Sequence, residues 1–392
     1  MPFILSRPLV VLAAAVAVLA AACASQAEAR SLTVGASESA SLVPDPVAAK
    51  SRMDLALLAG FNEIEVRASW KRGRTAPTAE ELAALQASAA AAQLDAIRLV
   101  VAVDTGGSSQ TPRTAAARAA FAAYTASLAR ALPYVRDFVV GNEPNLNRFW
   151  LPQFDRRGHD LAAPAYMALL ARTYDAVKAV SPQIRVIGGA LSPRGADRPG
   201  AARQTHSPTV FLRDLALAYR RSHRHRPLMD VLAIHPYGER SQTPPTATHP
   251  RSTSISIADY PKLVKVVRSG FHGTAQRSTS LPILYGEYGV QTQIPAAKRG
   301  SYSNFAVASA RDAVAEQRQG EYYRQAIRLA YCQPTVTGLL FFHVSDESNL
   351  DRWQSGLLYS DNTPKSDLAV VRQAAQAARA GTLTCPAKRP AR

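Results

Sequence analysis

Residues 97–103 read IRLVVAV, residues 114–131 read TAAARAAFAAYTASLARA, and residues 138–141 read FVVG. The first and last stretches are short apolar runs rich in β-branched residues, which is typical of buried strands. The stretch between them is rich in alanine, leucine and arginine and has helical periodicity. Strand, helix and strand in this order predict a parallel βαβ unit, because parallel neighbours need a crossover connection.

The same alternation continues along the chain. We expect strands at residues 32–34, 64–68, 97–103, 138–141, 186–190, 231–235, 283–286 and 338–343. We expect helices at residues 47–58, 78–94, 114–131, 163–180, 208–222, 257–269, 321–332 and about 365–380. Eight such pairs predict one α/β domain over residues 30–392, a (β/α)8 TIM barrel. An open doubly wound sheet is the alternative, but no G-x-G-x-x-G or P-loop lysine motif is present.

The composition fits an enzyme-sized core. The 392 residues are 47% hydrophobic, which excludes a disordered chain. The formal net charge is +17, but the arginines are scattered, and the nearest basic cluster, at residues 220–226, accompanies no nucleic-acid-binding motif. We therefore expect an Arg-rich solvated surface and no nucleic-acid partner, with an anionic cell envelope as the intermediate alternative.

Residues 1–29 predict a secretion signal. Arg7 forms a short basic region, residues 10–22 are apolar, and Ala27-Glu28-Ala29 is a small-x-small cleavage site. Two alternatives remain: a lipid anchor on Cys23, and an uncleaved membrane anchor. We expect a secreted, extracellular protein, with attachment to the cell envelope if Cys23 is acylated.

Export also gives the other cysteines a meaning. If Cys23 is removed or acylated, Cys332 and Cys385 are the remaining thiols of the three in the chain. An oxidising compartment favours joining them, so we predict a Cys332–Cys385 disulfide that ties the C-terminal tail back to the domain.

Two glutamates stand at the ends of predicted strands. Glu143 follows the fourth strand in Val139-Val140-Gly141-Asn142-Glu143-Pro144-Asn145, and Glu287 ends the seventh in Leu284-Tyr285-Gly286-Glu287-Tyr288-Gly289. Barrel chemistry is done at the C-terminal ends of strands, where a carboxylate beside an apolar strand must be hydrogen-bonded or useful. A capping or ion-paired acid is the alternative for either glutamate alone. Residues 239–256 and 288–319 are long loops that we expect to wall this face.

These motifs resemble those of clan A retaining glycoside hydrolases, in the general layout of the family 5 cellulase-like and family 39 members. The resemblance covers most of the chain after residue 30 and is strongest at Asn142-Glu143-Pro144, then at His235-Pro236-Tyr237. It implies that Glu143 is the acid/base and Glu287 the nucleophile. It further implies that Asn142 binds the sugar 2-hydroxyl, that Tyr237 hydrogen-bonds the nucleophile, and that Arg67 lies beneath it, while His235 belongs to the binding set.

A retaining hydrolase needs one protonated carboxyl group and one ionised carboxylate, with the two about 5–5.5 Å apart. Arg67 and Tyr237 would keep Glu287 ionised, whereas Glu143, beside an aromatic neighbour such as Trp150, could stay protonated. We therefore expect hydrolysis of a β-linked oligo- or polysaccharide with retention.

The chain departs from the family pattern at two strands. Asp104 stands where many clan members have a histidine after strand three, and we expect it to contact sugar hydroxyls instead. Strand eight lacks the usual tryptophan, so Phe342, His343 or Trp353 is the candidate aromatic or polar replacement at the sugar.

The sequence gives weaker support to other functions. His223 and His225 alternate with arginine at a spacing that completes no coordination sphere, so we expect no metal, and no cofactor motif is present. Nucleophile-elbow and Cys-His hydrolase motifs are absent. The main alternative is an inactive secreted barrel that binds envelope polysaccharide. We expect a monomer.

Overall fold

The computed structural model describes residues 30–305 and 312–386; the predicted secretion signal and Cys23 lie outside these residues. The strands are β1 (Thr33–Ser37), β2 (Glu63–Ser69), β3 (Arg98–Asp104), β4 (Asp137–Val140), β5 (Arg185–Leu191), β6 (Val231–Ile234), β7 (Ile283–Tyr288) and β8 (Val336–Phe341). The main helices are α1 (Pro46–Leu58), α2 (Ala79–Leu94), α3 (Ala115–Ala131), α4 (Ala162–Val180), α5 (Pro208–Arg221), α6 (Tyr260–Phe271), α7 (Glu316–Tyr331) and α8 (Leu368–Ala380).

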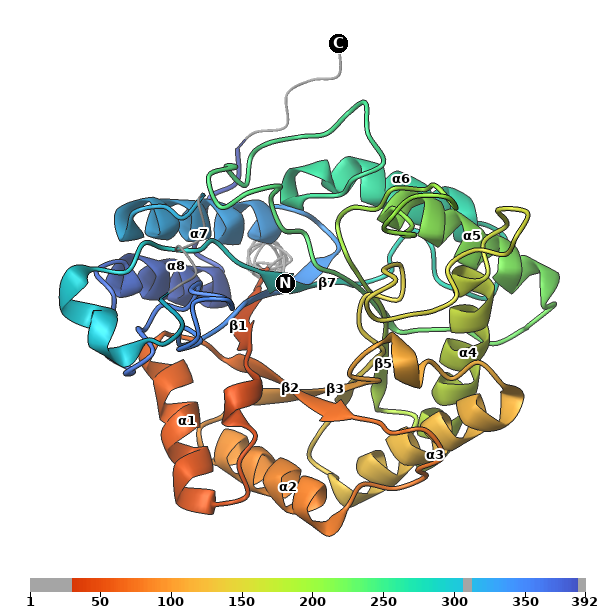
Figure 1. Cartoon of the computed structure of the whole chain (residues 1–392), viewed down its shortest axis with the longest axis horizontal. Helices are drawn as coiled ribbons and strands as arrows, with labels where there is room; N and C mark the ends of the chain where they lie inside the picture. The colour runs from red at the N-terminus through yellow and green to blue at the C-terminus, as the bar shows by residue number, and fades with distance from the viewer. Residues whose placement is uncertain (1–29, 306–311, 387–392) are drawn as a thin grey trace, which may run out of the picture.

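The strands form a closed barrel in sequence order, β1 to β8, and every neighbouring pair is parallel. The helices surround this barrel as an outer ring (Figure 1). The predicted (β/α)8 TIM barrel is therefore confirmed, and each predicted strand and helix is present with shifted ends.

The largest boundary errors have local causes. Helix α7 begins at Glu316, five residues before the predicted start, because its first turn is polar and adds no apolar periodicity to the sequence. Helix α6 begins at Tyr260, after a 3-10 turn at Ile257–Asp259, and Pro261 stands in its first turn. Strand β8 ends at Phe341, so Phe342 and His343 belong to the following loop.

The apolar core has two layers because each strand is buried on both faces. The outer layer fills the space between sheet and helices, and it includes Ile64 and Val66 of β2. The inner layer fills the barrel with small and branched side chains: Val100, Ala102, Val139, Ile187, Ala190, Val231, Ala233, Leu284 and Leu340.

Strand β2 breaks the apolar character of the barrel interior. Its residues alternate between faces, and Glu65 pairs with Val100 while Arg67 pairs with Ala102. Glu65 and Arg67 therefore stand on the inner face, directed into the barrel beside apolar neighbours. Charged side chains inside a barrel require compensating charges or hydrogen bonds.

Two further features concern the whole chain. In the part of the chain that the structure describes, no helix is long and apolar enough to cross a membrane. Cys332, just after α7, forms a disulfide with Cys385 in the C-terminal tail, which confirms the predicted pairing.

Replacing both cysteines by serine is expected to lower the free energy of unfolding by about 4 kcal/mol, because the bond closes a loop across 53 positions. Urea unfolding of the oxidised protein and the double variant measures this difference. A reducing agent should destabilise the original protein and leave the double variant unchanged. Equal stability of the two oxidised proteins would contradict the prediction.

Candidate active site

A cleft of about 820 Å³ opens at the C-terminal ends of the strands. Its lining includes most of the predicted site residues: Arg67, Asn142, Glu143, Tyr237, Glu287, Phe342, His343 and Trp353. Both predicted catalytic glutamates thus face one open space. A second hollow of about 620 Å³ borders this cleft, and the two share Glu347 and Arg352.

Glu287 is the more enclosed of the two glutamates. It is the fifth residue of β7 and is 6% exposed, and its Oε1 forms an ion pair with the Arg67 guanidinium. The Tyr237 hydroxyl donates a hydrogen bond to Oε2 at 2.9 Å. Burial by itself would raise the pKa of Glu287, but the charges of His235 and Arg67 and the hydrogen bond from Tyr237 hold it below its ordinary value. This carboxyl group is therefore kept ionised.

Glu143 follows β4 in an unusual backbone conformation. Its φ is 39°, in the left-handed region that non-glycine residues seldom adopt. The Glu143 N–H donates to the carbonyl of Ala190 at 2.9 Å, which fixes the turn after β4 against β5. Conformations of this kind persist where surrounding contacts hold them, and they cluster at functional sites.

One imidazole nitrogen joins the two glutamates. His235 follows β6 and is 2% exposed, and its Nδ1 lies 3.2 Å from Glu143 Oε1 and 3.5 Å from Glu287 Oε2. These two carboxylate oxygens can therefore lie no farther apart than the sum of the two distances. Burial lowers the pKa of His235, but Glu287 and Glu143 raise it above its ordinary value on balance.

Arg67 is shared by several carboxylates. Besides Glu287, it contacts Asp104 Oδ2 at 3.2 Å, and Asp104 also accepts hydrogen bonds from Ser69 Oγ at 3.4 Å and the Gly106 N–H at 2.8 Å. Asp104 is 5% exposed and is absent from the cleft lining. The structure thus places Asp104 behind Arg67, as a support for the guanidinium, instead of at the expected sugar contact.

Three aromatic rings form one wall of the cleft. The Trp353 ring lies 5.1 Å from the Tyr237 ring and 5.6 Å from the Phe342 ring, measured between centroids. Trp353 therefore reaches the cleft from the loop after β8, beside Phe342. His343 is held by a hydrogen bond between its Nδ1 and the Ser37 carbonyl at 2.8 Å.

Trp150 does not reach this site. It is 3% exposed and packs edge-on against Tyr166 of α4, with ring centroids 5.8 Å apart. The loop after β4 turns this indole into the layer between sheet and helices. Trp150 therefore does not line the cleft, contrary to the expected contact with substrate.

Glu65, on the inner face of β2, was not among the residues expected from the sequence. Its carboxyl group accepts a hydrogen bond from Ser37 Oγ at 3.2 Å, and burial raises its pKa to about 7, against the opposing charge of Arg67. The signal was present in the sequence: Glu63, Glu65 and Arg67 alternate within one apolar strand, so all three share a face.

Replacing Arg67 by methionine is expected to lower the free energy of unfolding at pH 7 by about 3–5 kcal/mol, because Glu287 and Asp104 lose their buried counter-charge. Without Arg67, the pKa of Glu287 rises in the folded state, because the guanidinium charge helps to lower it. The folded variant then binds protons more tightly, so its deficit should shrink as the pH falls from 7 to 5.

Urea unfolding at both pH values measures this change. Arg185→Met is the matched control, since Asp137 at the opposite end of the barrel keeps Arg98 as a partner. The control should lose less stability than Arg67→Met. A deficit for Arg67→Met that is the same at pH 5 and pH 7 would count against the proposed charge balance.

Comparison with known proteins supports the fold alone. No family model matches the chain, and no curated protein is similar in sequence. The chain is similar in structure to a GH5_18 protein from Streptomyces cattleya in complex with GlcNAc (19% identity, 92% of this chain, 83% of that chain, TM-score 0.59). It is also similar to a GH5-4 broad specificity endoglucanase from Clostridium longisporum (12% identity, 91% of this chain, 97% of that chain, TM-score 0.58). A third similar structure is the GH39 enzyme from Xanthomonas axonopodis pv. citri (16% identity, 88% of this chain, 65% of that chain, TM-score 0.52). The chain thus shares the (β/α)8 barrel fold of glycoside hydrolases in families GH5 and GH39.

Proposed function

We propose that this protein is a secreted glycosidase that cleaves a β-linked oligo- or polysaccharide with retention of anomeric configuration. The observation that carries the proposal is the unequal surroundings of two glutamates that face one cleft. Glu287 is held by Arg67 and Tyr237, whereas Glu143 has no arginine contact among the described residues. That asymmetry is what a nucleophile and an acid/base require.

In the first step, the Glu287 carboxylate attacks the anomeric carbon and forms a covalent glycosyl ester. Glu143 donates its proton to the glycosidic oxygen as the bond to the leaving group breaks. In the second step, Glu143 takes a proton from water, which attacks the anomeric carbon and releases Glu287 as a carboxylate. His235 touches both acids and can keep their orientations fixed through the two steps.

The cleft suits a sugar chain. The rings of Tyr237, Phe342 and Trp353 offer apolar faces to sugar CH groups, and Asn142 stands beside Glu143 in the lining. The bordering hollow gives room for more than one residue of an oligosaccharide. Streptomyces cattleya GH5_18 structures hold GlcNAc and Manβ1-4GlcNAc, which supports an oligosaccharide substrate.

An inactive envelope-binding barrel is less well supported, because both glutamates line one open cleft. Export through residues 1–29, an anchor on Cys23 and a monomeric state stay predictions from the sequence.

Replacing each of the two glutamates by glutamine should have different effects on kcat/KM. On aryl β-glycosides, Glu287→Gln is expected to lose about 10³-fold or more in kcat/KM with every leaving group, since the nucleophile is gone. Glu143→Gln should lose about 10²–10⁴-fold in the first step with a poor leaving group, and much less with one that departs without a proton. Initial rates over a series of phenol leaving groups, with NMR assignment of the first-formed anomer, measure both points.

Glu80→Gln is the matched control, because this glutamate is exposed in the first turn of α2 and does not line the cleft. Activity of Glu287→Gln equal to that of the unmodified protein would end the assignment. A first-formed product with inverted configuration would leave a glycosidase but reject the covalent step.

Tyr237→Phe is expected to move the acid limb of the kcat/KM profile to higher pH by about one pH unit. The variant removes a hydrogen bond that lowers the pKa of Glu287, so the carboxylate forms only at higher pH. Tyr331→Phe is the control: it removes a tyrosine hydroxyl that donates to the Gly381 carbonyl, remote from the cleft, and should leave the pH profile unchanged. An unmoved acid limb in Tyr237→Phe would show that another group controls it.

A further inference from the structure

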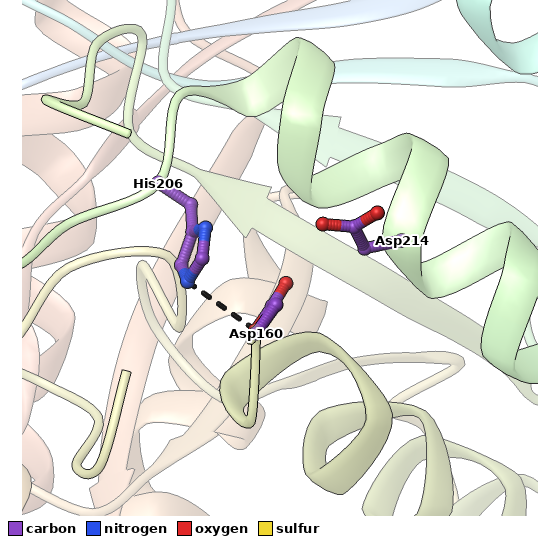
Figure 2. A group of neighbouring side chains, drawn as sticks. All are labelled: Asp160, His206 and Asp214. Atoms are coloured by element: carbon purple, nitrogen blue, oxygen red, sulfur yellow. Dashed lines mark ion pairs between the residues drawn. The ribbon is translucent and has the colours of Figure 1, made fainter. Parts of the chain in front are cut away.

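A second group of ionisable side chains lies outside the cleft. Asp160 precedes α4, His206 precedes α5, and Asp214 lies within α5 (Figure 2). One nitrogen or oxygen atom from each residue lies within 4.8 Å of the corresponding atoms of the other two. The sequence did not indicate this group, because the fold brings its members together from separate segments.

The hydrogen bonds of His206 fix the position of its proton. Nε2 lies 3.2 Å from the Gln153 carbonyl oxygen and 3.2 Å from Asp160 Oδ1, and both of these atoms are acceptors. The neutral ring therefore carries its proton on Nε2 and has a lone pair on Nδ1. Nδ1 is buried without a hydrogen-bond partner, and the side chain is 1% exposed.

Asp160 presents a second buried acceptor. Its Oδ1 accepts the Ala163 N–H at 3.0 Å and faces His206, whereas its Oδ2 is buried without a hydrogen-bond partner. The side chain is 9% exposed. Figure 2 shows the Asp160 oxygen without a partner and the Nδ1 edge of the imidazole directed toward Asp214. Three acceptors thus converge with no donor between them.

Such a group needs a positive charge in its centre. Burial disfavours the charged form of Asp160 and raises its pKa to about 6. An imidazole nitrogen with two carboxylate oxygens is a donor set that suits zinc or manganese. A histidine that binds a metal commonly donates its other N–H to a carbonyl or carboxylate, as His206 does here.

We propose that Asp160, His206 and Asp214 bind one divalent transition-metal ion through Asp160 Oδ2, His206 Nδ1 and an Asp214 oxygen. The ion would have a structural role. The His206 N–H donates to the Asn145 carbonyl at 2.8 Å, and Asn145 Nδ2 donates to the His206 carbonyl at 2.9 Å. Since Asn145 is two residues after Glu143, the ion would brace the loop that carries this glutamate.

The test uses the full chain after chelator treatment and dialysis. Isothermal titration with Zn²⁺ and Mn²⁺ should show one site for at least one of them, and the thermal unfolding midpoint should rise with the same ion. Asp214→Asn is the informative variant, because Asp214 is partly exposed and its loss leaves the His206 hydrogen bonds in place. It should weaken binding of the metal by about 100-fold.

Asp54→Asn, at an exposed acid on α1, is the control and should bind metal like the unmodified protein. The proposal is overturned if neither ion binds, because the acids then share a proton. It is also overturned if Asp214→Asn binds as tightly as the control. These readouts do not depend on enzymatic activity, so they stay informative even if the glycosidase proposal fails.

Discussion

The cleft depends on the ion pairs of the Arg67 guanidinium. Strand β2 carries it on the inner face of the barrel, where it meets Glu287 from β7 and Asp104 from β3. Coulombic attraction to these acids more than offsets the effect of burial and raises the pKa of Arg67 above its already high value. A carboxylate can therefore stay ionised in an enclosed place where burial alone would favour its neutral form.

The closed barrel makes this arrangement available to residues that are remote in sequence. All eight strands are parallel, so their C-terminal ends meet at one face, and side chains from β2, β4, β6 and β7 converge there. The register is demanding, since a slip of one residue in β2 would move Arg67 to the layer facing the helices. Asp104 compensates the charge of Arg67 by direct contact, whereas burial raises the pKa of Glu65 to about 7 against the charge of Arg67.

The sequence alone allowed the barrel and the facing glutamates to be predicted, because strand and helix periodicity and the Asn142-Glu143-Pro144 motif are local signals. It could not place Trp150, since the direction of a ring in a loop depends on packing against Tyr166. The disulfide could be predicted because the expected export leaves two thiols in an oxidising compartment. Asp160, His206 and Asp214 carry no shared spacing, and only the positions of α4 and α5 bring them together.

His235 contacts two acids whose surroundings differ. Its Nδ1 faces both, but Glu287 also receives the Arg67 charge and the Tyr237 hydrogen bond, so positive charge is concentrated on one side of the pair. The ionised form of Glu287 is therefore stabilised where burial alone would disfavour it. In the proposed mechanism, Glu287 loses its negative charge when the glycosyl ester forms, and His235 then faces one carboxylate instead of two. The proposed double displacement would thus use one imidazole to couple the two glutamates electrostatically.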